Sequence, residues 1–265
     1  MTSVPTEGDG LRILVCVKRV PDASSTVVLT EDAQAVDGRY VGFTLSNHEN
    51  CAVEMAVRLA DATGGSATVL TLGPEESTDQ LIGALSLGCR AATLIVADSS
   101  RFGPADVARE IAAVVRDHES AGAPYDLVLL GNDAADTGDF QVGIRLAYAL
   151  GLPVVNGVST VEVADGVLTA HASAADGEET NSLPLPAVAT VLEGGVEPRY
   201  PTIKGRIGAK KVTIEHREPT AEPVGPDRVR LLLPPPQPSA VQVLGEGPGA
   251  AAAVVDLLES LGVGR

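Results

Sequence analysis

Tryptophan is absent from this chain of 265 residues, and aromatic residues make up only 3% of it. The hydrophobic core must therefore be built from Ala, Val, Leu and Ile, a composition typical of buried parallel strands covered by Ala-rich helices. Positive charge is also scarce, and the formal net charge is −16. This charge argues against a nucleic-acid-binding protein, because neutralising phosphates requires clustered Lys and Arg.

Cysteine is rare as well, and the three residues Cys16, Cys51 and Cys89 form no CxxC pair. An odd number of widely spaced cysteines indicates a reducing, cytoplasmic setting. No apolar stretch approaches the ~20 residues that cross a bilayer. The first dozen residues lack the basic start and apolar run of a secretory signal. We therefore expect a cytoplasmic globular protein and not a membrane protein.

Sequence signatures of catalysis are missing too. The four histidines have no metal-ligand spacing, and the chain contains no GxSxG, Walker A or HExxH motif. Cys16 lies at the end of the first apolar run, but no neighbour in sequence would lower its pKa, which favours a buried structural thiol over a nucleophile. The sequence predicts neither an enzyme nor a metal site.

Short apolar runs alternate with amphipathic stretches in the first 150 residues. Strands are expected at 11–17, 67–72, 93–97 and 126–130, each followed by a helix with an apolar face. Strand followed by helix, repeated four times, predicts a three-layer α/β fold with a mostly parallel sheet.

Two of these helices carry the Ser-x-x-Glu/Gln spacing of a capping box at their start, at Ser46 with Glu49 and at Ser77 with Gln80. A hairpin is expected around VVLTEDAQAV, at 27–36. After residue 153 three strands follow without helices between them. They are expected to pair antiparallel or to extend one edge of the sheet.

The last 48 residues have a different composition. Residues 218–238 contain seven prolines and little periodicity, which indicates an extended arm, and a final helix is expected from about Ala250 to Leu261. The GEGPG stretch at 245–249 resembles a dinucleotide fingerprint, but that fingerprint needs a second strand and an acidic residue about 20 residues further on, the chain ends at Arg265, and Pro248 interrupts the turn. A turn that leads into the last helix is the better interpretation.

Ligands of an open parallel sheet bind at the carboxyl ends of its strands. The loop at 131–143 is the most unusual of these strand ends, since it is long, polar and bracketed by glycines. Backbone N–H groups at the following helix start are suited to a phosphate. The carboxylates Asp133, Asp136 and Asp139 would repel that phosphate, so a ribose contact or helix capping is favoured for them.

A basic segment lies between Arg199 and Arg217 and holds six of the nineteen Lys and Arg residues. It is either a solvated loop or, in so acidic a chain, a surface that docks an acidic partner.

Four stretches together resemble the electron-transfer flavoprotein beta-subunit family. They are VCVKRVPD at 15–22, LGPEESTDQLIGALSLG at 72–88, DLVLLGNDAADTGDFQVGIRLAYALGLP at 126–153, and LPAVATVLEGGVEPRYPTIKGRIGAKK at 185–211. The resemblance implies an adenine-nucleotide-binding, Rossmann-like domain over 1–217. It also implies a recognition loop at 191–213 for partner dehydrogenases. The arm and helix of 218–265 would then dock on a partner alpha subunit.

The family resemblance also implies ligands and site residues. The alpha subunit would hold most of a redox FAD, and this chain would bury a structural AMP, or a second FAD if it is a bifurcating member. Nucleotide contacts map to Cys16, Ser46 or Asn47, Leu72, and the loop residues Gly131, Asn132, Asp133, Ala134, Asp136, Thr137, Gly138, Asp139, Phe140, Gln141 and Val142. Partner contacts map to Arg199, Tyr200, Ile203, Lys204 and Arg206, with Ile203 as the apolar anchor.

Several positions depart from the family pattern. Asp133 replaces a Gln, Val196 replaces an Asn, and Ala172 and Ser173 stand where an Arg-Glu pair helps the alpha subunit to dock. The chain is therefore an electron-carrier subunit or a divergent nucleotide-binding paralogue that has lost electron transfer. An enzyme acting on adenylated substrates shares the fold but lacks support from any catalytic motif.

Overall fold

The computed structural model describes residues 10–22, 24, 26–226, 229–235 and 241–263. The chain divides into two compact units, Met1–Leu231 and Leu232–Arg265. The first unit contains every strand of the described residues.

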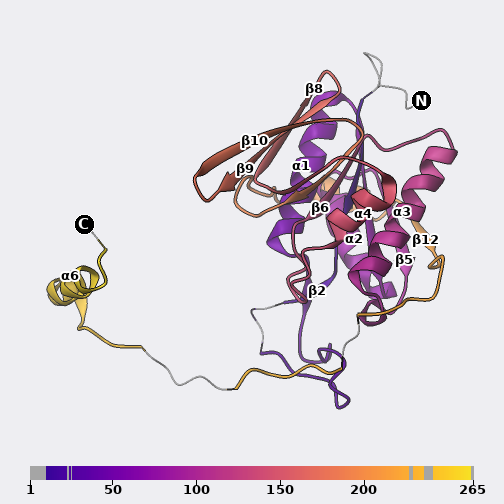
Figure 1. Cartoon of the computed structure of the whole chain (residues 1–265). Helices are drawn as coiled ribbons and strands as arrows, with labels where there is room; N and C mark the ends of the chain where they lie inside the picture. The colour runs from indigo at the N-terminus through magenta and orange to yellow at the C-terminus, as the bar shows by residue number, and fades with distance from the viewer. Residues whose placement is uncertain (1–9, 23, 25, 227–228, 236–240, 264–265) are drawn as a thin grey trace. The chain divides into compact units, whose positions relative to one another are not determined.

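A seven-stranded sheet forms the centre of the first unit (Figure 1), with the strand order β12-β5-β4-β1-β6-β11-β7. All neighbouring strands run parallel. The strands are β1 (Arg12–Cys16), β4 (Ser66–Gly73), β5 (Ala91–Val96), β6 (Leu127–Gly131), β7 (Val154–Val158), β11 (Ala187–Val191) and β12 (Ile214–Arg217). The predicted parallel α/β sheet is confirmed.

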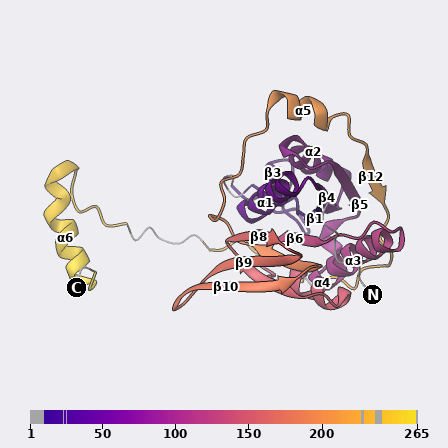
Figure 2. The same ribbon diagram turned by 90° about the horizontal axis from the view of Figure 1, so that it is seen from above.

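Four helices cover the two faces of this sheet (Figure 2). They are α1 (Asn47–Thr63), α2 (Thr78–Leu87), α3 (Pro104–Ser120) and α4 (Val142–Leu150). Successive side chains of a strand point to opposite faces. Ile13 and Val15 of β1 accordingly join the core beneath α1 and α2, whereas Leu14 and Cys16 join the core beneath α3 and α4. The result is the three-layer arrangement that the sequence predicts.

One of the two predicted capping boxes forms. At the start of α1 the Ser46 hydroxyl accepts from the Glu49 amide, and the Glu49 carboxylate accepts from the Ser46 amide. The box predicted at Ser77 and Gln80 is wrong, because a 3₁₀ turn at Glu75–Ser77 runs directly into α2. Ser77 is itself helical, with φ −66° and ψ −11°, whereas an N-cap needs an extended backbone to turn its hydroxyl toward the helix.

The second half of the unit combines both arrangements that the sequence leaves open. Strands β8 (Thr160–Ala164), β9 (Val167–Ala174) and β10 (Gly177–Pro184) form a separate antiparallel sheet. Strand β11 is inserted between β6 and β7 inside the parallel sheet, which makes β7 the edge. Two short strands, β2 (Val20–Pro21) and β3 (Phe43–Thr44), pair with each other, and a Leu29–Val36 bridge lies in the predicted hairpin.

The basic segment is more ordered than the sequence indicates. It contains a helix, α5 (Ile203–Ala209), which begins where the Thr202 hydroxyl accepts from the Gly205 amide. Helix α5 packs on the end of α2 so closely that a Cβ at Gly205 would lie 2.3 Å from the Ser86 carbonyl oxygen. Strand β12 then follows as an edge strand beside β5.

The first part of the Pro-rich arm is hydrogen-bonded to helix α3, and we call residues 218–226 the C-terminal strap. The buried Glu110 carboxylate accepts from the Thr220 amide and hydroxyl, at 2.6 and 2.8 Å. The buried Asp106 carboxylate accepts from the Val224 and Gly225 amides, at 3.0 and 2.9 Å. Two carboxylates on α3 therefore hold the strap in place.

Replacing Asp106 by Asn is expected to lower stability by about 2 kcal/mol at pH 7. Burial raises the pKa of Asp106, but amides of Val224, Gly225 and Gly103, together with the Arg109 side chain, outweigh it and hold this pKa at about 2. A carboxyl with a lowered folded-state pKa stabilises above its unfolded pKa near 3.8 and stops doing so as pH falls toward 2.

Urea unfolding from pH 7 to pH 2.5 measures this effect. The gap between wild type and Asp106→Asn should close as pH falls below about 4. Glu119→Gln, at an exposed carboxyl on the same helix, is the matched control and should cost little at any pH. A gap of constant size across the whole range would contradict the assignment.

The second unit contains the helix α6 (Ala251–Ser260), preceded by a 3₁₀ turn at Gly247–Ala250. Both the predicted last helix and the turn that leads into it from GEGPG are confirmed. No side chain of α6 is buried. Val254, Leu257, Leu258 and Leu261 recur at intervals of three and four residues and so share one face of the helix.

Candidate functional site

A cavity of about 100 Å³ lies at the carboxyl ends of the central strands. The chain passes from β1 outward to β4 and β5, and then returns to place β6 on the other side of β1. The cavity is lined by the ends of these strands, Cys16 of β1 and Leu130 and Gly131 of β6. This is the point of strand-order reversal where doubly wound sheets bind ligands.

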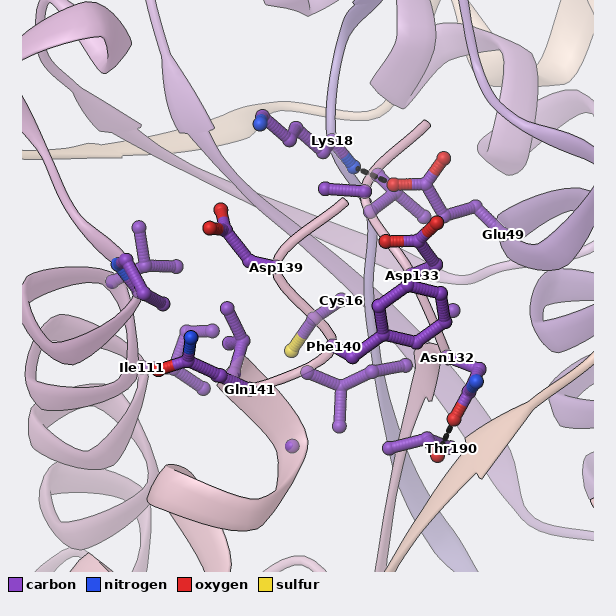
Figure 3. Close-up of a pocket in the computed structure, with 18 of the residues that line it drawn as sticks. Cys16, Lys18, Glu49, Ile111, Asn132, Asp133, Asp139, Phe140, Gln141 and Thr190 are labelled. Atoms are coloured by element: carbon purple, nitrogen blue, oxygen red, sulfur yellow. Dashed lines mark hydrogen bonds between the residues drawn. The ribbon is translucent and has the colours of Figure 1, made fainter. Parts of the chain in front are cut away.

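The cavity wall is apolar on its inner side and polar at its rim. The apolar part comes from both the sheet and α3, with Leu70, Leu130 and Ile111 among its side chains. The polar part comes from residues at strand ends and helix starts, several of which are labelled in Figure 3: Lys18, Glu49, Asn132, Asp133, Asp139, Gln141, Asn156 and Thr190.

The structure brings most of the expected nucleotide contacts to this one cavity. Those that line it are Cys16, Leu72, Gly131, Asn132, Asp133, Ala134, Asp139, Phe140, Gln141 and Val142. Ser46, Asn47, Asp136, Thr137 and Gly138 lie outside the lining. Of these, Ser46 caps α1 and Asn47 donates to the Glu193 carboxylate.

Lys18 is a cavity residue that the sequence did not single out. Its ammonium group lies 2.6 Å from the Asp136 carboxylate, which ties the loop after β1 to the loop after β6. The Thr137 hydroxyl in turn donates to the Asp139 carboxylate at 2.6 Å. The ion pair with Lys18 reduces the repulsion of an anion by Asp136, whereas the hydroxyl of Thr137 stabilises the Asp139 carboxylate without neutralising its charge.

Glu49 also binds the loop after β1. It is buried, and its two carboxylate oxygens accept from the Lys18 and Ser46 amides, each at 2.7 Å. Burial raises the pKa of Glu49, although these hydrogen bonds oppose the shift. The cap of α1 therefore also fixes the backbone at Lys18, just after the end of β1.

Thr190 of β11 joins two amide side chains at the cavity. Its hydroxyl oxygen lies 2.7 Å from Asn132 Oδ1 and 2.6 Å from Asn156 Oδ1, and it accepts from the Gly157 amide. A hydroxyl has a single proton, so only one of the two amide oxygens can accept from it at a time. The only sequence signal for this cluster is one polar residue inside the apolar run AVATV.

Helix α4 begins at the cavity. Gln141, Val142 and Gly143 line it, and the first backbone N–H groups of a helix have no partner within the helix. A Cβ at Gly143 would lie 2.3 Å from Thr190 Cγ2, so only glycine lets α4 start this close to β11. Unpartnered N–H groups and the helix dipole at such a start favour an anion.

The side chains fit a ligand that has both a phosphate and a group that donates hydrogen bonds. Asp133 could accept the ligand's hydrogen bond, because its Oδ1 is buried and has no hydrogen-bond partner among the described residues. A buried carboxylate oxygen without a donor is costly, so a ligand donor there would be favourable. The apolar inner wall and the start of α4 supply the rest of the fit.

The thiol of Cys16 shows no sign of activation. It is buried, and burial raises its pKa. A thiol with a raised pKa is a poor nucleophile at neutral pH, in agreement with the structural role expected from the sequence. Across the described ranges, no three His, Cys, Asp or Glu residues are grouped so that they could hold a metal ion.

The expected partner contacts lie on and next to α5. Tyr200 and Ile203 are 90% and 80% exposed, and Ile207 is 57% exposed one turn after Ile203. We call these three residues the α5 apolar face. Arg199 has a further contact, because its guanidinium binds the buried Glu54 of α1 at 2.8 Å and its pKa is raised by that hydrogen bond.

A parallel sheet wound in both directions, with a cavity at its switch point, defines the chain as a doubly wound α/β protein. The family model of the electron transfer flavoprotein domain matches residues 35–222, well over half of the chain. The chain belongs to the electron transfer flavoprotein family.

Curated relatives agree with this family. The chain is 31% identical over 241 residues to an electron transfer flavoprotein subunit beta of Syntrophomonas wolfei, covering 89% of this chain and 91% of the relative. It is 29% identical over 260 residues to the protein of the same name from Bacillus subtilis, covering 94% and 98%. The Mycobacterium tuberculosis relative is 33% identical over 204 residues, covering 75% and 76%.

No helix in the described residues is both long and apolar enough to span a bilayer.

Proposed function

We propose that this chain is the beta subunit of a heterodimeric electron-transfer flavoprotein, that it binds AMP in the cavity at the switch point, and that it carries no catalytic residues of its own. The observation that carries the proposal is the start of α4 at the cavity, where Gly143 allows backbone N–H groups to approach. FAD would be held mainly by the alpha subunit, and it supplies the redox chemistry when bound.

AMP is favoured over a second FAD by the dimensions of the site. The cavity measures about 100 Å³, below the roughly 300–1,000 Å³ typical of ligand pockets. AMP needs less additional room than FAD. The ion pair between Lys18 and Asp136 also joins the two loops that a larger ligand would have to separate.

In this proposal the α5 apolar face contacts partner dehydrogenases. Its three side chains are more than half exposed, and Lys204 and Arg206 lie on the same short helix. Few residues of a chain with net charge −16 are basic, so this patch would attract an acidic partner surface. The exposed apolar face of α6 would pack on the alpha subunit.

A nucleotide-binding paralogue without electron transfer is the second candidate, and β9 carries the observation that favours it. Ala172 and Ser173 leave this strand without the Arg-Glu pair of the family pattern. They lie directly opposite Glu179 and Glu178 of β10, and opposite residues of antiparallel strands share a face. Negative charge is therefore present on the sheet, but the arginine has no replacement at these positions.

Co-expression with an alpha subunit separates the two candidates. The proposal expects a complex with the visible absorbance of bound flavin, whose colour bleaches when a donor dehydrogenase and its substrate are added. This chain expressed alone should be colourless. A complex that binds flavin and AMP but is reduced by no donor would favour the paralogue.

A further inference from the structure

Two of the three phenylalanines of this chain line the same cavity. Phe102 follows the 3₁₀ turn before α3, and Phe140 lies just before α4. Aromatic residues make up only 3% of the chain, so their presence at one small site is notable on composition alone. A planar aromatic wall is suited to stacking on a planar ligand group.

Phe140 has an unusual backbone conformation. Its φ is +51°, in the left-handed region that a bulky residue rarely adopts. Gly138, two residues earlier, has φ +63°. The loop is thus folded sharply so that the aromatic residue reaches the cavity, and the surrounding contacts must hold it there.

Exposure shows that core packing does not explain this conformation. Phe140 is 51% exposed, although it lines the cavity, whereas Ile111 on the opposite α3 is 3% exposed. Figure 3 shows the Phe140 ring beside the Asp133 side chain, whose Oδ1 has no hydrogen-bond partner in the described residues. A flat apolar surface and a free acceptor are therefore presented together.

We propose that the Phe140 ring is the base-stacking wall of this cavity and the residue that makes binding depend on an aromatic base. The inference rests on the proposed function, since it takes the ligand to be a nucleotide. The cavity of about 100 Å³ is too small for a nucleotide with the ring where it is. The half-exposed ring turns toward solvent as the base enters and then covers one face of the base. Asp133 Oδ1 accepts a hydrogen bond from the ligand.

Binding of AMP and of ribose 5-phosphate to the full-length chain, freed of co-purified nucleotide, tests the proposal. Phe140→Ala should weaken AMP binding about 5- to 100-fold, the range for loss of one base–aromatic stack. It should change ribose 5-phosphate binding less than twofold. Phe140→Tyr should bind AMP like wild type. Because Ala keeps a Cβ, it tolerates positive φ no better than other residues, and the comparison isolates the ring.

A second readout does not depend on affinity. The chain contains no tryptophan, so Phe140→Trp creates a single tryptophan at the cavity, which can be excited selectively over the four tyrosines. Saturating AMP should quench this fluorescence strongly, while saturating ribose 5-phosphate should leave it nearly unchanged.

These experiments distinguish failure of the stacking role of Phe140 from failure of the proposed AMP binding. Equal AMP affinity in wild type and Phe140→Ala overturns the stacking role alone. The stacking role is also overturned if Phe140→Ala loses affinity equally for AMP and ribose 5-phosphate and AMP does not quench the fluorescence of Phe140→Trp. The ring would then have a purely structural role. Failure of the wild-type chain to bind AMP at all overturns the proposed function together with this inference.

Discussion

Deleting residues 239–265 is expected to abolish recovery of the alpha subunit while leaving AMP binding unchanged. The deletion removes α6, whose exposed apolar face consists of Val254, Leu257, Leu258 and Leu261. Obligate interfaces commonly exceed ~2,000 Å² of buried surface, so loss of a whole helix would remove much of one. The cavity residues all precede this segment.

Pull-down of a tagged chain with co-expressed alpha subunit, followed by measurement of bound flavin, checks this result. A point variant refines it: Leu258→Asp, on the apolar face, should reduce recovery strongly. Ala252→Asp, on the opposite face and in the first turn where an acid is favourable, is the matched control. Equal recovery of alpha subunit with the full-length and shortened chains would show that α6 is not a partner-binding element.

Ile203→Ala is expected to slow electron transfer with partner dehydrogenases roughly tenfold or more. A buried apolar anchor is worth about 1.5–3 kcal/mol, and Ile203 exposes 80% of its surface in this chain. The flavin spectrum of the heterodimer should not change, because the substitution removes surface contacts only. Steady-state reduction of the heterodimer by a donor dehydrogenase, over a range of heterodimer concentrations, measures the effect.

Tyr148→Ala is the matched control for this prediction. Tyr148 is 83% exposed, like Ile203, but it lies on α4, away from α5 in Figure 2. Its loss should leave the rate within about twofold of wild type. Wild-type rates for Ile203→Ala with every candidate dehydrogenase would contradict the anchor role of the α5 apolar face.

The sequence predicted those parts of the fold in which local patterns agree with tertiary burial. Runs such as LRILVCV and DLVLL are buried on both faces of the sheet and therefore read as strands without further information. Strand β10 was missed because GEETNSLP is mostly exposed and has little apolar alternation. Helix α5 was missed because KGRIGAKK contains two glycines, and its packing on α2, which the sequence does not reveal, supports it.

The candidate site likewise contains residues that the sequence predicted and residues that it did not. The loop at 131–142 could be predicted from its length, glycines and position after a buried strand. Lys18, Asn156 and Thr190 could not, because each meets its partners only through the sheet order, across 34 to 118 residues of chain. The two carboxylates of α3 that hold the C-terminal strap were missed for the same reason, as buried acids in a helix look like solvated ones in sequence.

The nucleotide content of the purified heterodimer tests the central claim most directly. The complex of this chain with its alpha subunit is denatured, and the released ligands are separated and quantified against protein. We predict one AMP and one FAD per heterodimer. Two FAD with no AMP would contradict the account, since the cavity at the switch point would then hold a flavin and this chain would take part in redox chemistry itself.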